Sequence, residues 1–327
     1  MFKGIRIDKN PDYCAELCSD LSESDLPTGE VTVRVRYSTL NYKDALAITG
    51  KGLIIRDFPM VPGIDFAGEV VSSDSERFKP GDEVILNGWG VGERHWGGLA
   101  EMARVPAQWL LHKPEGLSQR ETMALGTAGY TAMLAVQRIV DHGVTAGDSE
   151  IVVSGANGGV GSFAIAILAK LGYDVTALTR RVDESAYLID TLGAKAIMDS
   201  SEYGSKGKPL VKERWVAAVD SLGSHTLANI CAATRYGGIV TACGLAQGMD
   251  FEGTVAPFIL RGVTLAGIDS VMRPQADREA AWQQLAETFG GSPLLNAISE
   301  NISLQDVPAA AEDLLAGKIR GRVVVEI

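Results

Sequence analysis

The segment Glu150-Ile-Val-Val-Ser-Gly-Ala-Asn-Gly-Gly-Val-Gly-Ser-Phe-Ala-Ile-Ala-Ile-Leu-Ala-Lys-Leu-Gly172 joins a β-branched run to a glycine cluster and then to an apolar, alanine-rich stretch. A strand, a glycine turn and a helix in this order are typical of a dinucleotide-binding unit. We expect Gly155 to allow the tight turn and Gly158 to let the backbone approach a pyrophosphate. Gly161 would let the helix pack closely on the sheet.

The glycine turn departs from the G-x-G-x-x-G pattern, because Ala156 stands where the pattern has its first glycine. An ordinary β-to-α turn would also explain such a cluster. The next apolar segment, Asp174 to Thr179, predicts a second strand, and it ends in Arg180-Arg181 with no acidic residue at that point. A carboxylate there would bind the ribose of NAD, whereas a basic side chain accommodates a 2′-phosphate. The sequence therefore predicts NADPH rather than NADH.

Composition excludes several classes of protein. The chain has 327 residues and 46% hydrophobic residues, which is typical of a globular protein with two domains. Its formal net charge of −11 argues against partners such as nucleic acid or an anionic membrane. Four cysteines make no disulfide framework, and the N-terminal segment has no continuous apolar run. We therefore expect a cytoplasmic protein.

Upstream of this segment, short apolar runs alternate with turns such as Pro62-Gly63, which predicts a small β barrel or sandwich. The sequence pattern changes from short apolar runs to a helical stretch at Ser118-Gln-Arg-Glu121, which has the form of a capping box. Beyond it, strands alternate with helices, and this favours a doubly wound parallel sheet of the Rossmann type, an α/β fold. The predicted domains are a β domain over 1–120, a nucleotide-binding domain over 121–268 and a C-terminal segment over 269–327.

Two predicted strands need partners. The closing run, Arg322 to Ile327, is apolar, and we expect it to return to the N-terminal β domain. Val263 to Ile268 would be the last strand of the nucleotide sheet, with an open edge that a second copy of the chain could cover. The sequence therefore favours a homodimer.

The order of these parts resembles the medium-chain dehydrogenase/reductase superfamily over the whole chain. Within it, five motifs resemble the NADPH-dependent acrylyl-CoA reductase branch of the zinc-free, quinone-oxidoreductase-like group. The motifs are residues 40–50 (LNYKDALAITG), 58–68 (FPMVPGIDFAG), 88–98 (GWGVGERHWGG), 154–161 (SGANGGVG), and 257–262 (PFILRG) continuing to Ser270-Val-Met272. This resemblance implies a GroES-like β-barrel catalytic domain beside the Rossmann domain.

Many members of this superfamily hold a catalytic zinc ion, which needs about three Cys, His or carboxylate ligands. The chain has Asn41-Tyr42 where those enzymes supply a Cys, and Pro62-Gly-Ile-Asp65 where they have Pro-Gly-His-Glu. It also has no cysteine between Cys18 and Cys231. The sequence therefore predicts that the enzyme binds no metal.

Without a Lewis acid, reduction of a conjugated C=C bond is more favourable than reduction of a carbonyl to an alcohol. Hydride delivered to the β carbon of an enoyl thioester makes an enolate, which hydrogen-bond donors can stabilise. Asn41 and Tyr42 are the predicted donors. Asp44 and Asp65 resemble carboxylates of the family's cleft, where they would orient the donors or relay a proton. An Asx turn or loop cap is the alternative for both.

The resemblance also implies cofactor contacts. They are Gly158, Gly159, Val160, Gly161 and Ser162 at the pyrophosphate, Thr179, Arg180 and Arg181 at the 2′-phosphate, Tyr42, Leu245, Ile259 and Ser270 around the nicotinamide, and the hydroxyl of Thr127. For Val160, Leu245 and Ile259 a place in the core is the alternative. Arg322 is expected at the surface, with a CoA contact as the alternative; Arg56 and Arg261 are the other candidate cations for CoA.

The expected activity is zinc-independent, NADPH-dependent reduction of the C=C bond of an α,β-unsaturated acyl-CoA, with acrylyl-CoA giving propanoyl-CoA. An NADPH:quinone oxidoreductase on the same scaffold is the nearest alternative. A non-catalytic nucleotide-binding protein is an alternative of another class, because a fold alone does not fix function.

Overall fold

The computed structural model describes residues 1–9, 12–147 and 150–327. The chain forms two compact units. Unit 1 consists of Met1–Thr127 and Ser270–Ile327, so it contains both ends of the chain, and unit 2 consists of Ala128–Asp269.

A parallel sheet forms the centre of unit 2. The described part of this unit contains six strands in the order β10-β9-β8-β11-β12-β13, and every neighbouring pair is parallel. The order corresponds to the 3-2-1-4-5-6 arrangement of a doubly wound dinucleotide fold, so the predicted Rossmann sheet is confirmed. The strands are β8 (Glu150–Ser154), β9 (Asp174–Thr179), β10 (Ala196–Asp199), β11 (Trp215–Asp220), β12 (Thr234–Ala242) and β13 (Thr264–Gly267).

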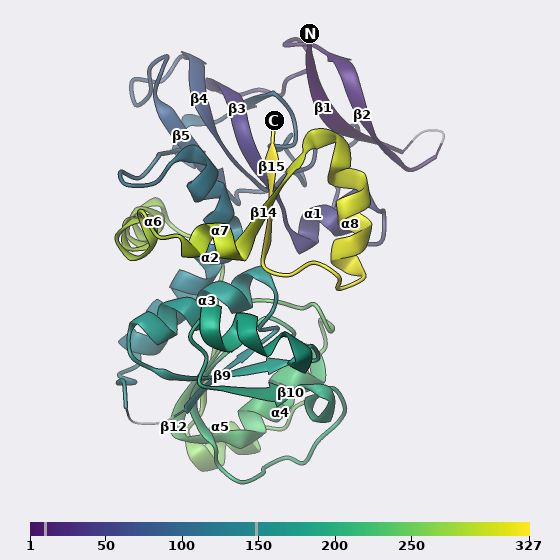
Figure 1. Cartoon of the computed structure of the whole chain (residues 1–327). Helices are drawn as coiled ribbons and strands as arrows, with labels where there is room; N and C mark the ends of the chain where they lie inside the picture. The colour runs from purple at the N-terminus through teal and green to yellow at the C-terminus, as the bar shows by residue number, and fades with distance from the viewer. Residues whose placement is uncertain (10–11, 148–149) are drawn as a thin grey trace. The chain divides into compact units, whose positions relative to one another are not determined.

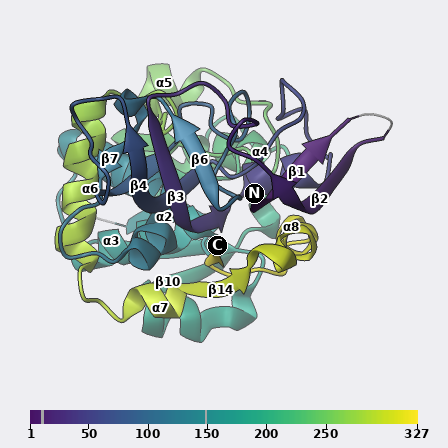
Figure 2. The same ribbon diagram turned by 90° about the horizontal axis from the view of Figure 1, so that it is seen from above.

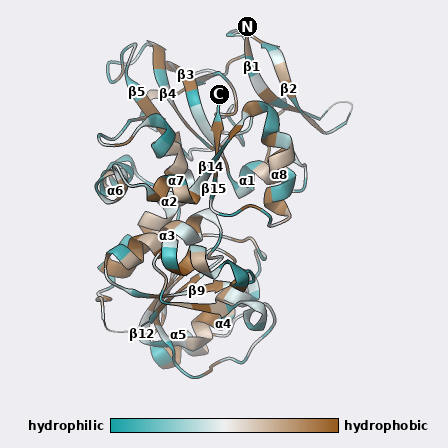
Figure 3. Ribbon diagram, viewed as in Figure 1, coloured by the Kyte–Doolittle hydropathy of each residue, from teal (hydrophilic) through white to brown (hydrophobic). Residues whose placement is uncertain are grey.

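Buried apolar side chains explain why these segments form central strands and their covering helices. Residues 151–153 of β8 are fully buried, as expected for a parallel strand covered on both faces, and Figure 3 shows brown, hydrophobic stretches on the strands of unit 2. The described α-helices that lie wholly in unit 2 are α3 (Gly159–Lys170), α4 (Ser224–Ala233) and α5 (Ala256–Arg261). A 3₁₀ turn, η2 (Val182–Glu184), and a π-helical turn, η3 (Tyr187–Thr191), follow β9.

Unit 1 is built on β structure. Its described residues form a seven-stranded sheet, with β14-β15-β3-β4-β5-β7 in order and β6 also paired to β3, and a separate hairpin of β1 and β2. The strands are β1 (Phe2–Asp8), β2 (Cys14–Leu21), β3 (Val31–Leu40), β4 (Asp65–Ser73), β5 (Glu83–Asn87), β6 (Met102–Val105), β7 (Leu111–His112), β14 (Ser299–Ser303) and β15 (Arg322–Glu326).

The C-terminal strand lies beside an N-terminal one. β15 pairs antiparallel with β3, with Val324 opposite Thr39, and parallel with β14 (Figure 1). Figure 2 shows the C-terminus near β14. The side chains of Val323, Val324 and Val325 are buried. This pairing places Arg322, the first residue of β15, near the end of β3.

Five helices are described in or beginning in unit 1: α1 (Tyr42–Ile48), α2 (Gln119–Asp141), α6 (Gln275–Phe289), α7 (Leu294–Ile298) and α8 (Val307–Leu315). The predicted capping box begins α2, because Ser118 and Glu121 exchange side-chain and backbone hydrogen bonds. α2 is broken at Gly126, whose φ of 50° and ψ of −158° are not helical. Over the described residues, no helix is long and apolar enough to span a bilayer.

Candidate functional site

A buried polar cluster lies in unit 1 where β3 ends and α1 begins. Asn41 is at its centre. Its amide Nδ2 contacts three acceptors: Thr39 Oγ1 at 2.9 Å, Asp44 Oδ2 at 3.1 Å and Asp65 Oδ1 at 3.2 Å. Its Oδ1 accepts a hydrogen bond of 3.0 Å from Arg322 Nη1. An amide has two N–H groups, so three protein acceptors leave none for a substrate oxygen.

This arrangement corrects the expected role of Asn41. The sequence predicted a donor to the enolate, whereas the structure shows a buried amide whose donors are all directed at protein groups. Asn41 therefore acts as a positioning residue for the start of α1.

Asp44 is buried and joins α1 to the loop before β4. Its Oδ2 accepts from the backbone N–H of Asn41 at 2.9 Å, and its Oδ1 accepts from those of Gly63 and Ile64 at 3.1 and 3.0 Å. Burial, and next the charge of Asp65, raise the pKa of Asp44 to about 7, while the bonds from Asn41 and Ile64 lower it. These contacts are those of a loop cap, which was the alternative to a catalytic role for Asp44.

Asp65, the first residue of β4, fixes the break in α2. Its Oδ2 accepts the backbone N–H of Thr127 at 2.7 Å, and its Oδ1 accepts the Thr39 hydroxyl. Gly126 precedes Thr127, and a Cβ there would lie 2.6 Å from Arg322 Nη2 and 2.9 Å from Asp65 Oδ2. Only glycine combines this positive φ with room for both charged groups.

The structure contradicts the expected surface position of Arg322. Its side chain is only 4% exposed, and its Nε donates to the carbonyl of Ala124 at 3.4 Å. Burial lowers the pKa of Arg322, and the charges of Asp65 and Asp44 oppose that effect. The sequence gave no local signal, because the partners of Arg322 lie far away along the chain. Arg322 therefore belongs to the buried polar cluster. Its burial also argues against the alternative role, a contact with CoA.

Tyr42 differs from the cluster beside it. It is the first residue of α1, and its side chain is 40% exposed. Asn41 and Tyr42 were the two predicted donors to the enolate. The Asn41 amide donates only to protein groups, so Tyr42 is the one of the two that lies at the surface of unit 1.

A second set of contacts in unit 1 holds the segment that contains Ser270. Arg278, buried on α6, donates to the carbonyls of Asn87 at 2.7 Å, Val271 at 2.5 Å and Ser270 at 3.3 Å. Its guanidinium carbon lies 4.5 Å from the centre of the Trp89 ring. Arg278 therefore joins the Ser270 segment to the loop after β5. The sequence pattern did not single it out.

Thr127, a further predicted cofactor contact in unit 1, lies in α2 beside Asn87 at the end of β5. Its hydroxyl is 3.4 Å from Asn87 Nδ2, and its side chain is partly exposed. The position is compatible with the predicted hydroxyl contact.

In unit 2, the glycine turn joins β8 to α3 next to the point where strand order reverses, which is where ligands bind in such sheets. Gly155 has a φ of +60°, as a tight turn requires. A Cβ on Gly161 would lie 2.3 Å from the carbonyl oxygen of Gly155, so helix and turn approach as closely as predicted. Gly158 is exposed and Gly159 and Val160 are partly exposed, so the turn presents backbone to solvent.

Ser162 lies behind this turn. It is buried, its hydroxyl is 3.4 Å from the carbonyl of Ala156, and it accepts a 2.8 Å bond from Tyr187. These contacts make Ser162 a packing residue and weaken the case for a phosphate contact through its side chain.

The end of β9 carries an acidic side chain that the sequence pattern did not reveal. Arg181 Nη1 lies 3.3 Å from Glu184 Oε1, and Glu184 Oε2 accepts a 2.6 Å bond from Asn157 Nδ2. Thr179, whose hydroxyl donates to Asn157, also accepts the backbone N–H of Arg181 at 3.0 Å. No acidic residue stands at the strand end itself, but η2 brings the carboxylate of Glu184 back to Arg181. Arg180 is exposed.

Two residues predicted at the nicotinamide are exposed on unit 2. Leu245 follows β12, and Ile259 lies on α5 with 73% of its side chain exposed. A place in the core is thus excluded for both, and Val160 is only partly buried.

The three candidate cations for CoA differ in their contacts and exposure. Arg261 donates to the carbonyls of Ala232, Thr234 and Val211, so it ties unit 2 together. Arg322 is buried, as described above. Arg56 is exposed and remains the candidate.

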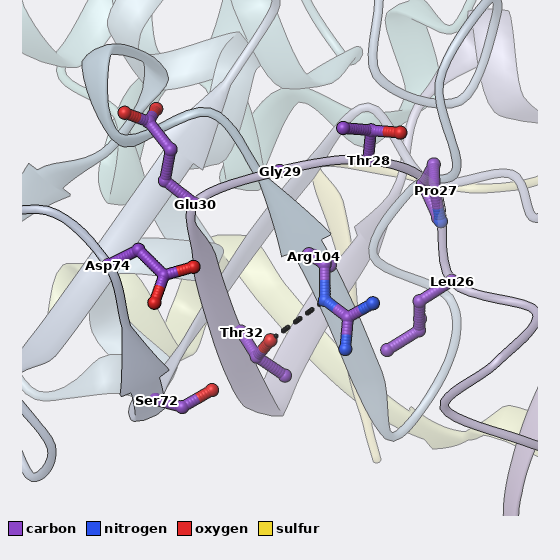
Figure 4. A pocket seen from close by; sticks show the side chains of 9 residues that line it. All are labelled: Leu26, Pro27, Thr28, Gly29, Glu30, Thr32, Ser72, Asp74 and Arg104. Carbon is purple, nitrogen blue, oxygen red and sulfur yellow. Dashed lines mark hydrogen bonds between the residues drawn. The ribbon is translucent and has the colours of Figure 1, made fainter.

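Unit 1 also has an open pocket of about 380 Å³ between the Leu26–Glu30 loop and β3, β4 and β6. Figure 4 shows Glu30, Asp74 and Arg104 in its wall, with Arg104 donating to Thr32 at 3.0 Å. None of the predicted site residues lines this pocket, and its wall is mostly polar. We do not assign the substrate to it.

Comparison with known proteins agrees with this architecture. Residues 27–115 match the family described as alcohol dehydrogenase GroES-like domain, and residues 159–287 match the family described as zinc-binding dehydrogenase. The predicted GroES-like domain is thereby confirmed. Among the residues that the structure describes, no group of three or more His, Cys, Asp or Glu side chains is placed to hold a metal ion.

Relatives match over nearly the whole chain. Acrylyl-CoA reductase AcuI of Ruegeria pomeroyi is 48% identical over 100% of this chain and 99% of its own. A protein of Escherichia coli named as probable acrylyl-CoA reductase AcuI is 52% identical over 94% of each chain. The yhdH oxidoreductase of Salmonella enterica, solved in complex with NADP, is 49% identical and covers 100% of both chains with a TM-score of 0.96. The chain belongs to the medium-chain dehydrogenase/reductase superfamily and, within it, to the group that contains the AcuI reductases.

Proposed function

We propose that this chain is an NADPH-dependent reductase of the C=C bond of α,β-unsaturated acyl-CoA, converting acrylyl-CoA to propanoyl-CoA. The observation that carries the proposal is the buried cluster that fixes the start of α1 beside the exposed Tyr42. The names of relatives at 48–52% identity support the same substrate.

NADPH, when bound, supplies the hydride that adds to the β carbon of the substrate. Gly159 and Val160 of the glycine turn would hold its pyrophosphate through their backbone N–H groups, Gly158 would let the backbone approach it, and Arg181 would hold its 2′-phosphate. The turn fits this role because Gly158 is exposed and Gly159 and Val160 are partly exposed, and the first N–H groups of a helix have no partner within the helix.

The residues of unit 1 would act on the substrate. As negative charge develops on the thioester oxygen, the Tyr42 hydroxyl donates a hydrogen bond to it. Asn41, Asp44, Asp65 and Arg322 hold the backbone that carries Tyr42 in one position, so the donor needs no reorganisation during the reaction. Water then protonates the α carbon of the enolate, which gives the saturated thioester and hydroxide.

The Tyr42→Phe variant should lower kcat by about tenfold to 100-fold and raise KM by less than about threefold, because the lost bond forms mainly in the transition state. Steady-state kinetics with acrylyl-CoA measure both constants. Tyr37→Phe, on β3 of the same unit, is the control and should match the wild type. A wild-type kcat in Tyr42→Phe would contradict the assigned role.

Arg181→Ala should weaken NADPH binding by about tenfold, because a charge-assisted hydrogen bond to the 2′-phosphate contributes roughly 1.5–3 kcal/mol and this site is partly exposed. NADH lacks that phosphate, so its affinity should hardly change. Fluorescence titration of both cofactors into both proteins tests this. Equal affinity of the wild type for the two cofactors would refute the preference.

The proposed reaction is independent of zinc, because Asn41 and Asp65 are engaged with protein groups at the positions where zinc enzymes place ligands. A strong chelator should leave the rate unchanged, and elemental analysis of the purified protein should give less than stoichiometric zinc. Activity that is lost on chelation and restored by zinc would reverse this part of the mechanism.

We also propose a cytoplasmic homodimer. β13 is the last strand of its sheet, and the exposed apolar side chains of Val255, Ile259, Leu260 and Leu265 lie on it or on the preceding α5 segment. A second copy would cover this edge. Light scattering that gives the mass of one 34.7 kDa chain would contradict the dimer. The free cysteines fit a reducing compartment, which cell fractionation tests.

A further inference from the structure

Glu184 occupies an unusual place for a carboxylate in a site assigned to NADPH. It lies at the end of η2, and its two oxygens face different partners, Arg181 on one side and Asn157 of the glycine turn on the other. The backbone N–H of Glu184 also donates to the carbonyl of Arg181 at 3.2 Å. The carboxylate therefore has two side-chain partners, and the turn that carries it folds back on Arg181.

Its chemistry opposes that of the predicted ligand. A 2′-phosphate needs cations, and a carboxylate beside Arg181 both repels the phosphate and competes for the same N–H groups. A carboxylate near this strand end is instead the feature that favours the ribose hydroxyls of NAD. Arg181 and Glu184 are 28% and 25% exposed, so water screens the pair only partly.

We propose that Glu184 is a specificity-determining residue that reduces the preference for NADPH over NADH by competing with the 2′-phosphate for Arg181. The inference rests on the proposed NADPH-dependent function. Neutralising Glu184 removes one competitor of the phosphate for Arg181 and one repulsive charge, while Gln can still accept the bond from Asn157.

The test compares Glu184→Gln with Asp183→Asn. Asp183 is the exposed neighbour of Glu184, so its variant removes the same formal charge from the same turn. Fluorescence titration with NADPH, NADH and 2′,5′-ADP gives the dissociation constants. In Glu184→Gln the Kd for NADPH and 2′,5′-ADP should fall about fivefold, which corresponds to about 1 kcal/mol. The Kd for NADH should stay the same or rise, and Asp183→Asn should change each value by less than about twofold.

A double-mutant cycle identifies the route of the effect. If Glu184 acts through Arg181, Glu184→Gln should tighten NADPH binding much less in an Arg181→Ala background than in the wild type. The proposal is overturned by an unchanged or weaker NADPH affinity in Glu184→Gln, by an equal gain for NADH, or by an equal gain in Asp183→Asn. A wild type that binds NADH but not NADPH would overturn the cofactor assignment as well, whereas failure of the variant alone leaves that assignment intact.

Discussion

Replacing Arg322 by methionine is expected to lower the free energy of unfolding by about 3–5 kcal/mol, because it removes one charge from a buried cluster and leaves others uncompensated. Arg322 Nη1 supports the Asn41 amide, and the guanidinium faces the Asp65 carboxylate across Gly126. Without it, the charges of Asp65 and Asp44 lie in an interior from which water is excluded. The position of Tyr42 depends on the same contacts, so turnover should fall too.

Urea denaturation followed by fluorescence measures the stability. Arg36→Met, at an exposed position on β3 of the same unit, is the matched control and should change the free energy of unfolding by no more than about 0.5 kcal/mol. If Arg322→Met proves as stable as Arg36→Met, the buried cluster does not stabilise unit 1 and Asn41 is not a positioning residue.

The Rossmann sheet could be predicted because its signals are local. The strand, turn and helix around Gly155 to Gly161 lie within one short segment, and each following strand is a compact apolar run. Parallel pairing then follows from the alternation of strands and helices. The positions of these strands and helices could therefore be predicted before their order in the sheet was known.

Arg322 could not be placed in this way. Its partner Asn41 is 281 positions away, and a charged residue after a glycine normally indicates the surface. Burial here depends on the pairing of β15 with β3, which aligns Val323 with Leu40. The saturation of the Asn41 amide is equally non-local, because its acceptors come from both β3 and β4 as well as α1.

Glu184 was missed for a different reason. It lies five residues beyond Thr179, and a sequence pattern places the acidic ribose ligand at the strand end itself. The turn η2 shortens that distance in space and returns the carboxylate to Arg181. Asn157, which completes the contact, stands in the glycine turn at a position where the pattern accepts any residue.

The largest kinetic effect is expected when CoA, the carrier of the acyl group, is removed from the substrate. A three-carbon acyl group offers little apolar area, so free acrylate brings little binding energy to position its C=C bond. CoA supplies that energy through contacts away from the reacting carbons, and Arg56 is an exposed cation available to its phosphates. We therefore expect kcat/KM for free acrylate to be lower than for acrylyl-CoA by about 10³-fold or more, or about 4 kcal/mol.

The most direct test follows NADPH oxidation by the wild-type protein with acrylyl-CoA, crotonyl-CoA, free acrylate and a benzoquinone at matched concentrations. We expect the highest kcat/KM for acrylyl-CoA, a lower value for the longer crotonyl-CoA and the lowest for acrylate. A kcat/KM for the quinone that exceeds that for acrylyl-CoA by a large factor would contradict the proposed function and make the chain a quinone oxidoreductase.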